Sequence, residues 1–200
     1  MPSPLKSKER FSDRKEKGDK TEKAFMDLIA LMGGTAQAIG KVPTMGDPTP
    51  RFCRPSAQSE DGFRYSVSPD IVFTLPDQPR GMASLAQVKL KKLQRDPSKG
   101  RLLIYLDEQE LHRMNEAAMF YDVFFVIHVP ELAATEGFSE WMWVNVDDLQ
   151  EDRISLIKRR IQNKPTFLLP LDLFRPLSEL KKRPLHAPSN TNAPPTDRRV

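Results

Sequence analysis

The feature that most constrains the fold is a run of apolar residues of strand length, VFFVIHV, from Val123 to Val129. Side chains alternate between the two faces of a sheet, so a strand that is apolar at nearly every position has to be covered on both faces. Such a strand lies inside a sheet that has other elements packed on either side. The run therefore predicts an α/β fold built around one central sheet.

A helix is expected near the N-terminus, over residues 19–32. Asp19 has the right chemistry for an N-cap, and the Gly33-Gly34 pair is expected to end the helix. The apolar positions recur at i, i+3, i+4 and i+7, which is typical of an amphipathic helix with one buried face. These positions are Phe25, Leu28, Ile29 and Met32.

A hairpin and a second helix are expected in the middle of the chain. Strands near 70–75 and 83–91 are separated by a turn over 77–81, so we expect them to pair as an antiparallel hairpin. Asp107 and Glu110 have the spacing of a capping box, and they predict a helix that runs from there to about residue 120.

Beyond the apolar run, the patterns are weaker. A strand is expected over 141–146 and a helix over 148–162, while the proline-rich segment 35–67 predicts only one or two short strands. The outer face of the expected helix is basic, and it could be simply solvated or could contact DNA. That face consists of Arg153, Lys158, Arg159 and Arg160.

The expected organisation is one domain over 18–183, with a core over 18–130 and an extension over 131–183. The flanking segments 1–17 and 184–200 are polar and poor in apolar residues, so we expect them to be disordered. No apolar run approaches the roughly 20 residues of a membrane span, and the N-terminus lacks the apolar centre of a signal peptide. Together with the single cysteine, this predicts a cytoplasmic protein that has no membrane partner.

The basic character of the chain is unevenly distributed. The net charge is +4 and the isoelectric point about 9.2, but residues 1–20 carry +3 and residues 181–200 carry +4. The remaining 160 residues therefore total −3, so the overall charge is weak support for DNA binding. Residues 80–101 are an exception, with seven Lys or Arg and one acid. These lysines could grip phosphates or could protect the edge of a sheet.

Polar residues in the expected hairpin are the candidate site. Residues two apart in a strand share a face, so Gln87 and Lys89 point to the same side, and Asp70 begins the partner strand. A carboxylate and an amide oxygen can hold a hard divalent cation, and a nearby ammonium can stabilise developing charge. That combination is suited to cleaving phosphodiesters. A structural ion pair between Asp70 and Lys89 in an unrelated α/β protein is the alternative.

Glu22 is a further candidate on the first expected helix. It is seven residues before Ile29, which places it within about 20° of the apolar stripe, so a carboxylate points towards the core. Two readings are open at this point. Glu22 could belong to the site, or it could complete a capping box with Asp19.

The order of these motifs resembles the PD-(D/E)XK nuclease superfamily, and within it the archaeal-type Holliday junction resolvases. The matching segments are Lys17-Gly18-Asp19-Lys20-Thr21-Glu22, Pro69-Asp70, Gln87-Val88-Lys89 and Tyr105-Leu106 leading into the Leu111 helix. The resemblance covers residues 17–129. It implies a restriction-endonuclease-like αβββαβ core, with a mixed central sheet flanked by helices and a C-terminal strand-helix extension.

The resemblance also implies roles for individual residues. Glu22 and Asp70 would be metal-associated acids, Lys89 would be the catalytic lysine, and Gln87 stands where the family usually has a glutamate. The cofactor would be Mg²⁺, with Mn²⁺ able to substitute. A neutral amide contributes no charge, so we expect weaker metal affinity or a single metal. Ser56 could be the small polar residue that resolvases place after their first strand.

The expected activity is metal-dependent endonucleolytic cleavage of DNA, with branched DNA in recombination or repair as one substrate class. Lys91, Lys92 and Arg95 would contact phosphates. The resemblance to resolvases implies a homodimer, and no nucleotide cofactor is expected. The alternative is a non-catalytic nucleic-acid-binding or assembly module that retains the fold. Trp141 and Trp143 could stack on bases, although core packing is the simpler reading. The three histidines have no ligand spacing.

Overall fold

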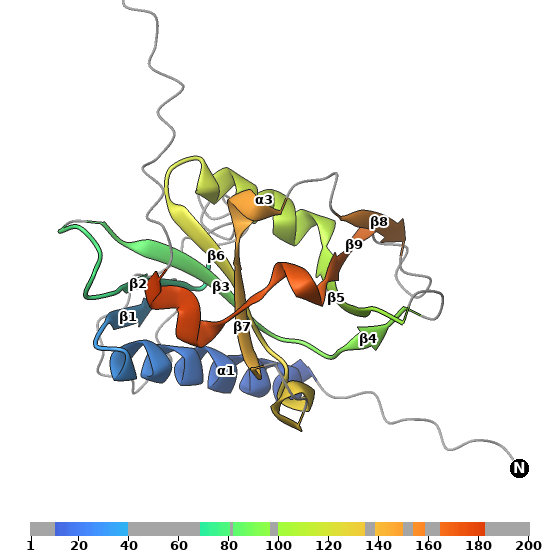
Figure 1. The fold of residues 1–200 in the computed structure, drawn as a ribbon, viewed down its shortest axis with the longest axis horizontal. Helices are drawn as coiled ribbons and strands as arrows, with labels where there is room; N and C mark the ends of the chain where they lie inside the picture. The colour runs from blue at the N-terminus through green and yellow to red at the C-terminus, as the bar shows by residue number, and fades with distance from the viewer. Residues whose placement is uncertain are drawn as a thin grey trace, which may run out of the picture.

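The computed structural model describes residues 11–39, 69–80, 82–96, 100–134, 139–149, 154–158 and 165–182. The helices are α1 (Phe11–Leu31) and α3 (Glu108–Ala118), and four short 3-10 turns are η1 (Pro130–Ala134), η2 (Val146–Asp148), η4 (Leu171–Leu173) and η5 (Leu177–Lys182). The strands are β1 (Thr35–Ala38), β2 (Ile71–Thr74), β3 (Ser84–Leu90), β4 (Gln94–Arg95), β5 (Leu102–Asp107), β6 (Asp122–His128), β7 (Trp141–Asn145), β8 (Ser155–Lys158), β9 (Pro165–Pro170) and β10 (Arg175–Pro176) (Figure 1).

A six-stranded mixed sheet in the order β1-β2-β3-β6-β7-β10 forms the centre of the fold. The apolar run expected to be an interior strand is β6, which lies parallel to β3 on one side and antiparallel to β7 on the other. Its residues from Val123 to Ile127 are all buried. The prediction of a strand covered on both faces is therefore confirmed.

Helix α1 covers one face of this sheet. Phe25 and Ile29 are fully buried there and share a core with Ala86 and Val88 of β3 and with residues of β2, β6 and β7. Trp141 and Trp143 also lie in this core, so they pack inside the protein as the simpler reading of the sequence has it.

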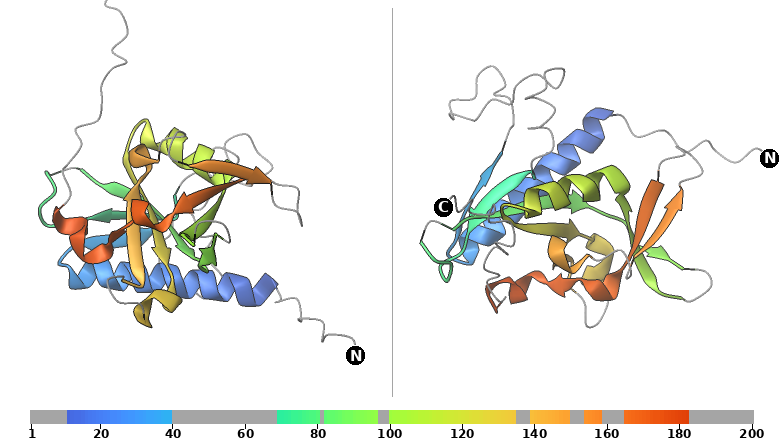
Figure 2. Two further views of the ribbon diagram at one scale, coloured as in Figure 1. Left: turned by 45° about the vertical axis from the view of Figure 1, so that its right-hand side comes forward. Right: turned by 90° about the horizontal axis from the view of Figure 1, so that it is seen from above.

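The opposite face is covered by α3 and by a second sheet. Figure 1 shows α3 on the other side of the central sheet from α1, and Figure 2 shows the four-stranded sheet beside α3. That second sheet has the order β4-β5-β9-β8, and its strands are antiparallel. Leu111 and Met114 of α3 are buried in this second core together with Ile104 and Leu169 of the second sheet. The site lies on this side of the central sheet.

The first helix begins earlier than expected, at Phe11 instead of Asp19. Its first two turns carry charged residues with good helix propensity, and Glu16 and Lys20 form an ion pair of 2.7 Å one turn apart. Asp19 is thus inside the helix and is not its N-cap, so the capping-box reading of Glu22 is wrong. The helix does end at the glycines: Gly33 has a φ of +80°, and a Cβ on Gly34 would meet the Thr74 carbonyl oxygen at 2.2 Å.

The C-terminal part differs most from the expectation. The helix expected over 148–162 is wrong, because residues 155–158 form β8 and pair with β9. Among the described residues between β7 and β8, 146–148 form the short turn η2. The expected strand-helix extension instead supplies strands to both sheets, with β7 and β10 in the central one and β8 and β9 in the second. Long-range strand pairing has overridden the local helical spacing of the isoleucines.

The expected αβββαβ order is present as α1, β1, β2, β3, α3 and β6, with the small strands β4 and β5 inserted after β3. Residues 40–68, including Ser56, lie outside the described residues, as do most residues of the expected tails and the basic residues Arg153, Arg159 and Arg160. The division into one domain and two tails stays a prediction. Within the described ranges, no helix is long and apolar enough to cross a membrane.

Candidate active site

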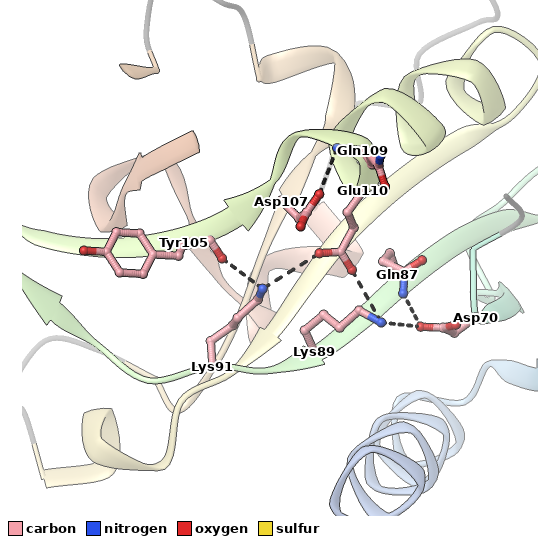
Figure 3. A network of polar contacts seen from close by, with 8 residues as sticks. All are labelled: Asp70, Gln87, Lys89, Lys91, Tyr105, Asp107, Gln109 and Glu110. Atoms are coloured by element: carbon pink, nitrogen blue, oxygen red, sulfur yellow. Dashed lines mark hydrogen bonds and ion pairs between the residues drawn. The ribbon is translucent and has the colours of Figure 1, made fainter. Parts of the chain in front are cut away.

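The hairpin of β2 and β3 brings Asp70 beside Gln87. Ile71 pairs with Ala86 in this antiparallel ladder, so the residue before Ile71 lies next to the residue after Ala86. The Nε2 atom of Gln87 donates a hydrogen bond to Oδ2 of Asp70 (Figure 3). The sequence prediction that these two residues come together is borne out by this contact.

Lys89 completes the group expected from the sequence. Its Nζ atom lies 3.3 Å from Oδ2 of Asp70. Ala86 and Val88 point into the core under α1, so Gln87 and Lys89 point to the other face, towards α3. Three polar side chains from one hairpin thus meet on one face of the central sheet.

Glu110, on α3, is a fourth residue of the group, although the sequence predicts a capping role for it. Oε1 of Glu110 lies 3.4 Å from Nζ of Lys89, so Lys89 is held between two carboxylates, as Figure 3 shows. Asp107 is the N-cap of α3 and accepts a hydrogen bond of 3.0 Å from the Gln109 amide, as predicted. Glu110 makes these ion pairs in place of its expected capping role. No sequence signal separates an acid in a capping box from one that faces a lysine across the fold.

Lys91 has more internal partners than expected for a phosphate-binding residue. Its Nζ atom donates to the Tyr105 carbonyl oxygen at 2.9 Å and lies 3.9 Å from Oε2 of Glu110. It also lies 5.6 Å from the centre of the Phe125 ring, and its side chain is only 19% exposed. Lys91 therefore holds Glu110 in place from within. Lys92 and Arg95, by contrast, are exposed.

The charge state of Lys89 follows from its surroundings. Burial acts to lower the pKa of Lys89, but the Asp70 and Glu110 carboxylates outweigh this effect and raise the pKa above its ordinary value of 10.5. The side chain is therefore an ammonium at neutral pH. It can stabilise negative charge or orient a reactant, but it cannot act there as a neutral general base.

Glu22 lies on α1, which packs on the face of β3 opposite to Gln87 and Lys89. Its side chain is half-buried, and its Oε2 atom is buried from solvent, which agrees with a carboxylate that points inward. The two carboxylates whose charges raise the pKa of Lys89 are those of Asp70 and Glu110. A metal-binding role of Glu22 stays a prediction.

The residues present fit one divalent cation. Asp70 offers a carboxylate whose side chain is 22% exposed, and Gln87 beside it offers an amide oxygen. Mg²⁺ is commonly held by one or two carboxylates and several waters, and this donor set matches that pattern. Among the described residues, no three His, Cys, Asp or Glu side chains form a group that could hold a metal ion.

The histidines in the described part of the chain have other partners. His128 stacks on Trp141 with ring centres 4.4 Å apart and lies 3.5 Å from a Glu140 carboxylate oxygen. His112 faces Glu116 one turn along α3, at 3.4 Å and largely exposed. Neither histidine joins the group around Lys89.

Comparisons with known proteins find similar solved structures but no family. No family model matches the chain, and no curated protein matches it. Among solved structures, it is similar to Hjc, a Holliday junction resolvase from the archaeal hyperthermophile Archaeoglobus fulgidus, with a TM-score of 0.45 and 13% identity over 85% of this chain and 99% of that one. It is also similar to D212, a nuclease from a fusselovirus, with a TM-score of 0.45 and 9% identity over 91% of this chain and 92% of that one.

At these scores and identities, any function has to be inferred from the chain's own residues.

Proposed function

We propose that this protein is a divalent-metal-dependent DNA endonuclease. The observation that carries the proposal is the meeting of Asp70, Gln87 and Lys89 on one face of the β2–β3 hairpin, where Gln87 is buried and the other two side chains are partly exposed. An oxygen donor set for one hard cation next to an ammonium is suited to the hydrolysis of a phosphodiester.

Each residue would have a separate task. Asp70 and Gln87 would hold Mg²⁺ or Mn²⁺, which when bound supplies positive charge at the phosphate and activates water. Lys89 would stabilise the negative charge that develops on the phosphate oxygens, since its ammonium stays protonated at neutral pH. Glu22 would contribute a further metal-associated acid from α1.

DNA would approach along the basic segment that follows the site. Lys92 and Arg95 lie just beyond β3 and are exposed, so they are suited to contacting phosphates on either side of the cut. Lys91 would contribute by fixing the site, given its internal partners. Because these contacts are electrostatic, binding should weaken as salt concentration rises.

Branched DNA is the first substrate to test, because the motif order resembles that of Holliday junction resolvases. Paired cuts across a junction require two active sites related by symmetry, so this substrate also implies a homodimer. A linear duplex cut in restriction or repair is the other substrate class, and it is compatible with a monomer.

A panel of labelled DNAs tests the proposal. The panel contains a four-way junction, a flap, a linear duplex and a single strand, each incubated with Mg²⁺, with Mn²⁺ and with a chelator. We expect metal-dependent cleavage of at least one substrate, lost in Lys89→Ala and in Asp70→Asn. Cleavage by Lys89→Ala at the rate of the parent protein would show that the assignment is wrong.

One observation favours a second candidate, a non-catalytic DNA-binding or assembly module. The charges of Asp70 and Glu110 are balanced by those of Lys89 and Lys91, and Gln87 adds no charge, so the group is neutral without any metal. This candidate predicts that the protein shifts DNA in a gel but cuts none of the panel. It also predicts that Lys89→Ala leaves the affinity for DNA unchanged.

A further inference from the structure

Lys89 is shared between two carboxylates that belong to different parts of the fold. Asp70 begins β2 and lies 3.3 Å from the ammonium, while Glu110 lies in the first turn of α3 and is 3.4 Å from it. The two distances are nearly equal, so neither acid holds Lys89 alone. Only one of the two, Asp70, is also a proposed metal ligand.

We propose that Glu110 is the positioning residue for Lys89, and that it keeps the ammonium in place and draws it away from Asp70 when Asp70 binds a cation. This inference rests on the proposed function, because it concerns the metal and the lysine of the same site. It assigns Glu110 no contact with the metal or with DNA.

Competition at Asp70 gives the physical reason. A cation and an ammonium are both attracted to the same carboxylate and repel each other, so a metal ion that binds Asp70 weakens the bond between Asp70 and Lys89. A partly buried lysine that loses its anionic partner would move towards solvent or resist metal binding. Glu110 supplies a second anionic partner on the side away from Asp70, so Lys89 can yield Asp70 to the cation at little cost.

The surroundings of Glu110 fix it for this task. Leu111, which follows it in the chain, and Met114, one turn further along α3, are buried in the second core, and Asp107 caps the helix from which Glu110 projects. Its other carboxylate oxygen, Oε2, faces Lys91, which is itself held by the Tyr105 carbonyl oxygen (Figure 3). A carboxylate held at both oxygens on a rigid helix can set the position of a lysine.

Metal titration of Glu110 variants tests the inference. Binding of Mn²⁺ to the full chain, followed by electron paramagnetic resonance, gives a readout that does not depend on cleavage. We expect Glu110→Gln to weaken Mn²⁺ binding about fivefold, because Lys89 then pairs with Asp70 alone. Glu110→Asp should recover part of this affinity. Glu108→Gln removes the same charge from the same turn of α3 and should leave the affinity within about twofold.

The same variants made in a Lys89→Ala background separate positioning from a simple charge effect. If Glu110 acts through Lys89, removing Lys89 should reduce the effect of Glu110→Gln on Mn²⁺ affinity to less than about twofold. In cleavage assays, Glu110→Gln should lower kcat about tenfold and leave the KM for DNA unchanged. Thermal melting of each variant shows whether the fold is retained. If Glu110→Gln does not fold, Glu110→Asp takes its place in both titrations.

Two results would overturn the inference: equal Mn²⁺ affinity of the parent protein and Glu110→Gln, or the same loss of affinity with and without Lys89. Neither result affects the proposed function if the parent protein still cleaves and Lys89→Ala does not. Conversely, coupled Mn²⁺ binding without cleavage of any DNA would sink the endonuclease and leave the positioning role of Glu110 standing.

Discussion

Strand β3 carries two polar networks that differ in kind. The site cluster (Asp70, Gln87, Lys89, Lys91 and Glu110) lies towards its C-terminal end, and the turn network (Gln78, Ser84, Asp122 and Asn145) lies at its N-terminal end. In the turn network, Gln78 donates to Ser84 at 2.8 Å, Ser84 lies 3.4 Å from Asp122, and Asn145 donates to Asp122 at 2.8 Å. Both networks tie the β2–β3 hairpin to other parts of the fold.

The difference lies in charge and exposure. Four of the five side chains in the site cluster are charged, and those four are 19–36% exposed. The turn network contains a single carboxylate among amides and a hydroxyl, with Ser84 at 0% and Asn145 at 5% exposure. Hydrogen bonds made by buried side chains are costly to break, whereas ion pairs near solvent add little stability. The turn network thus serves the fold, and the site cluster needs a functional explanation.

The largest expected effect is on cleavage, from Lys89→Ala. Removing one group that stabilises developing charge typically slows a reaction by about 10²–10³-fold, and we expect that loss here. Single-turnover cleavage of the preferred DNA measures it. Lys181→Ala removes an equivalent charge from an exposed position in η5 and should cleave like the parent protein. Loss of cleavage in both variants would assign the effect to overall charge.

The next effect is on stability, from Asn145→Ala in the turn network. Asn145 donates to Asp122 and accepts from the Asp147 amide at 2.9 Å, so its loss removes two hydrogen bonds made by a buried side chain and should cost about 2 kcal/mol of unfolding free energy. Urea unfolding measures this value. Asn115→Ala, the same change at an exposed position of α3, is the control. If Asn145→Ala lowered the free energy of metal binding more than the free energy of unfolding, the turn network would not serve the fold alone.

Gln87→Glu adds an acid to the site cluster, which increases its difference in charge from the turn network. The new carboxylate would lie beside Asp70, so metal affinity should rise about tenfold, while unfolding free energy without metal should fall by about 1 kcal/mol. Metal titration and urea unfolding follow the two effects. Gln109→Glu makes the same change at an exposed position outside the cluster. An unchanged metal affinity in Gln87→Glu would place the cation elsewhere.

The smallest effect is on the pH dependence of stability. The folded protein holds the pKa of Lys89 above its ordinary value of 10.5, so the stability that this shift contributes is fully present below pH 10.5 and is lost as pH rises through the folded value. The unfolding free energy of the parent protein relative to Lys89→Met should thus be constant from pH 7 to 9 and fall only above about pH 10.5. A decline that begins below pH 9 would contradict the raised pKa.

The parts of the fold and site that local patterns specify were predictable from the sequence. An apolar run has few solutions other than an interior strand, and the turn over 77–81 fixes the pairing of the strands on either side. That pairing and the two-residue period of a strand together place Asp70, Gln87 and Lys89 on one face. These three members of the site cluster are therefore encoded within the segment 70–89.

The parts that depend on distant partners were not predictable. Ile154, Ile157 and Ile161 have a spacing that suits a helix, and only the pairing of residues 155–158 with β9 makes that segment a strand. Glu110 has the spacing of a capping residue, and only the packing of α3 over β3 turns it towards Lys89. The first turns of α1 are stabilised by helix propensity and by the Glu16–Lys20 ion pair. Neither produces an apolar pattern in the sequence from which the earlier start of the helix could be predicted.

The central claim is that the site cluster binds a catalytic cation through Asp70. Calorimetric titration of Mg²⁺ and Mn²⁺ into the parent protein and into Asp70→Asn tests it most directly, with Asn145→Ala titrated alongside. We expect a single binding event in the parent protein and in Asn145→Ala that is lost in Asp70→Asn. Equal binding in Asp70→Asn, or no binding by the parent protein at millimolar metal, would contradict it.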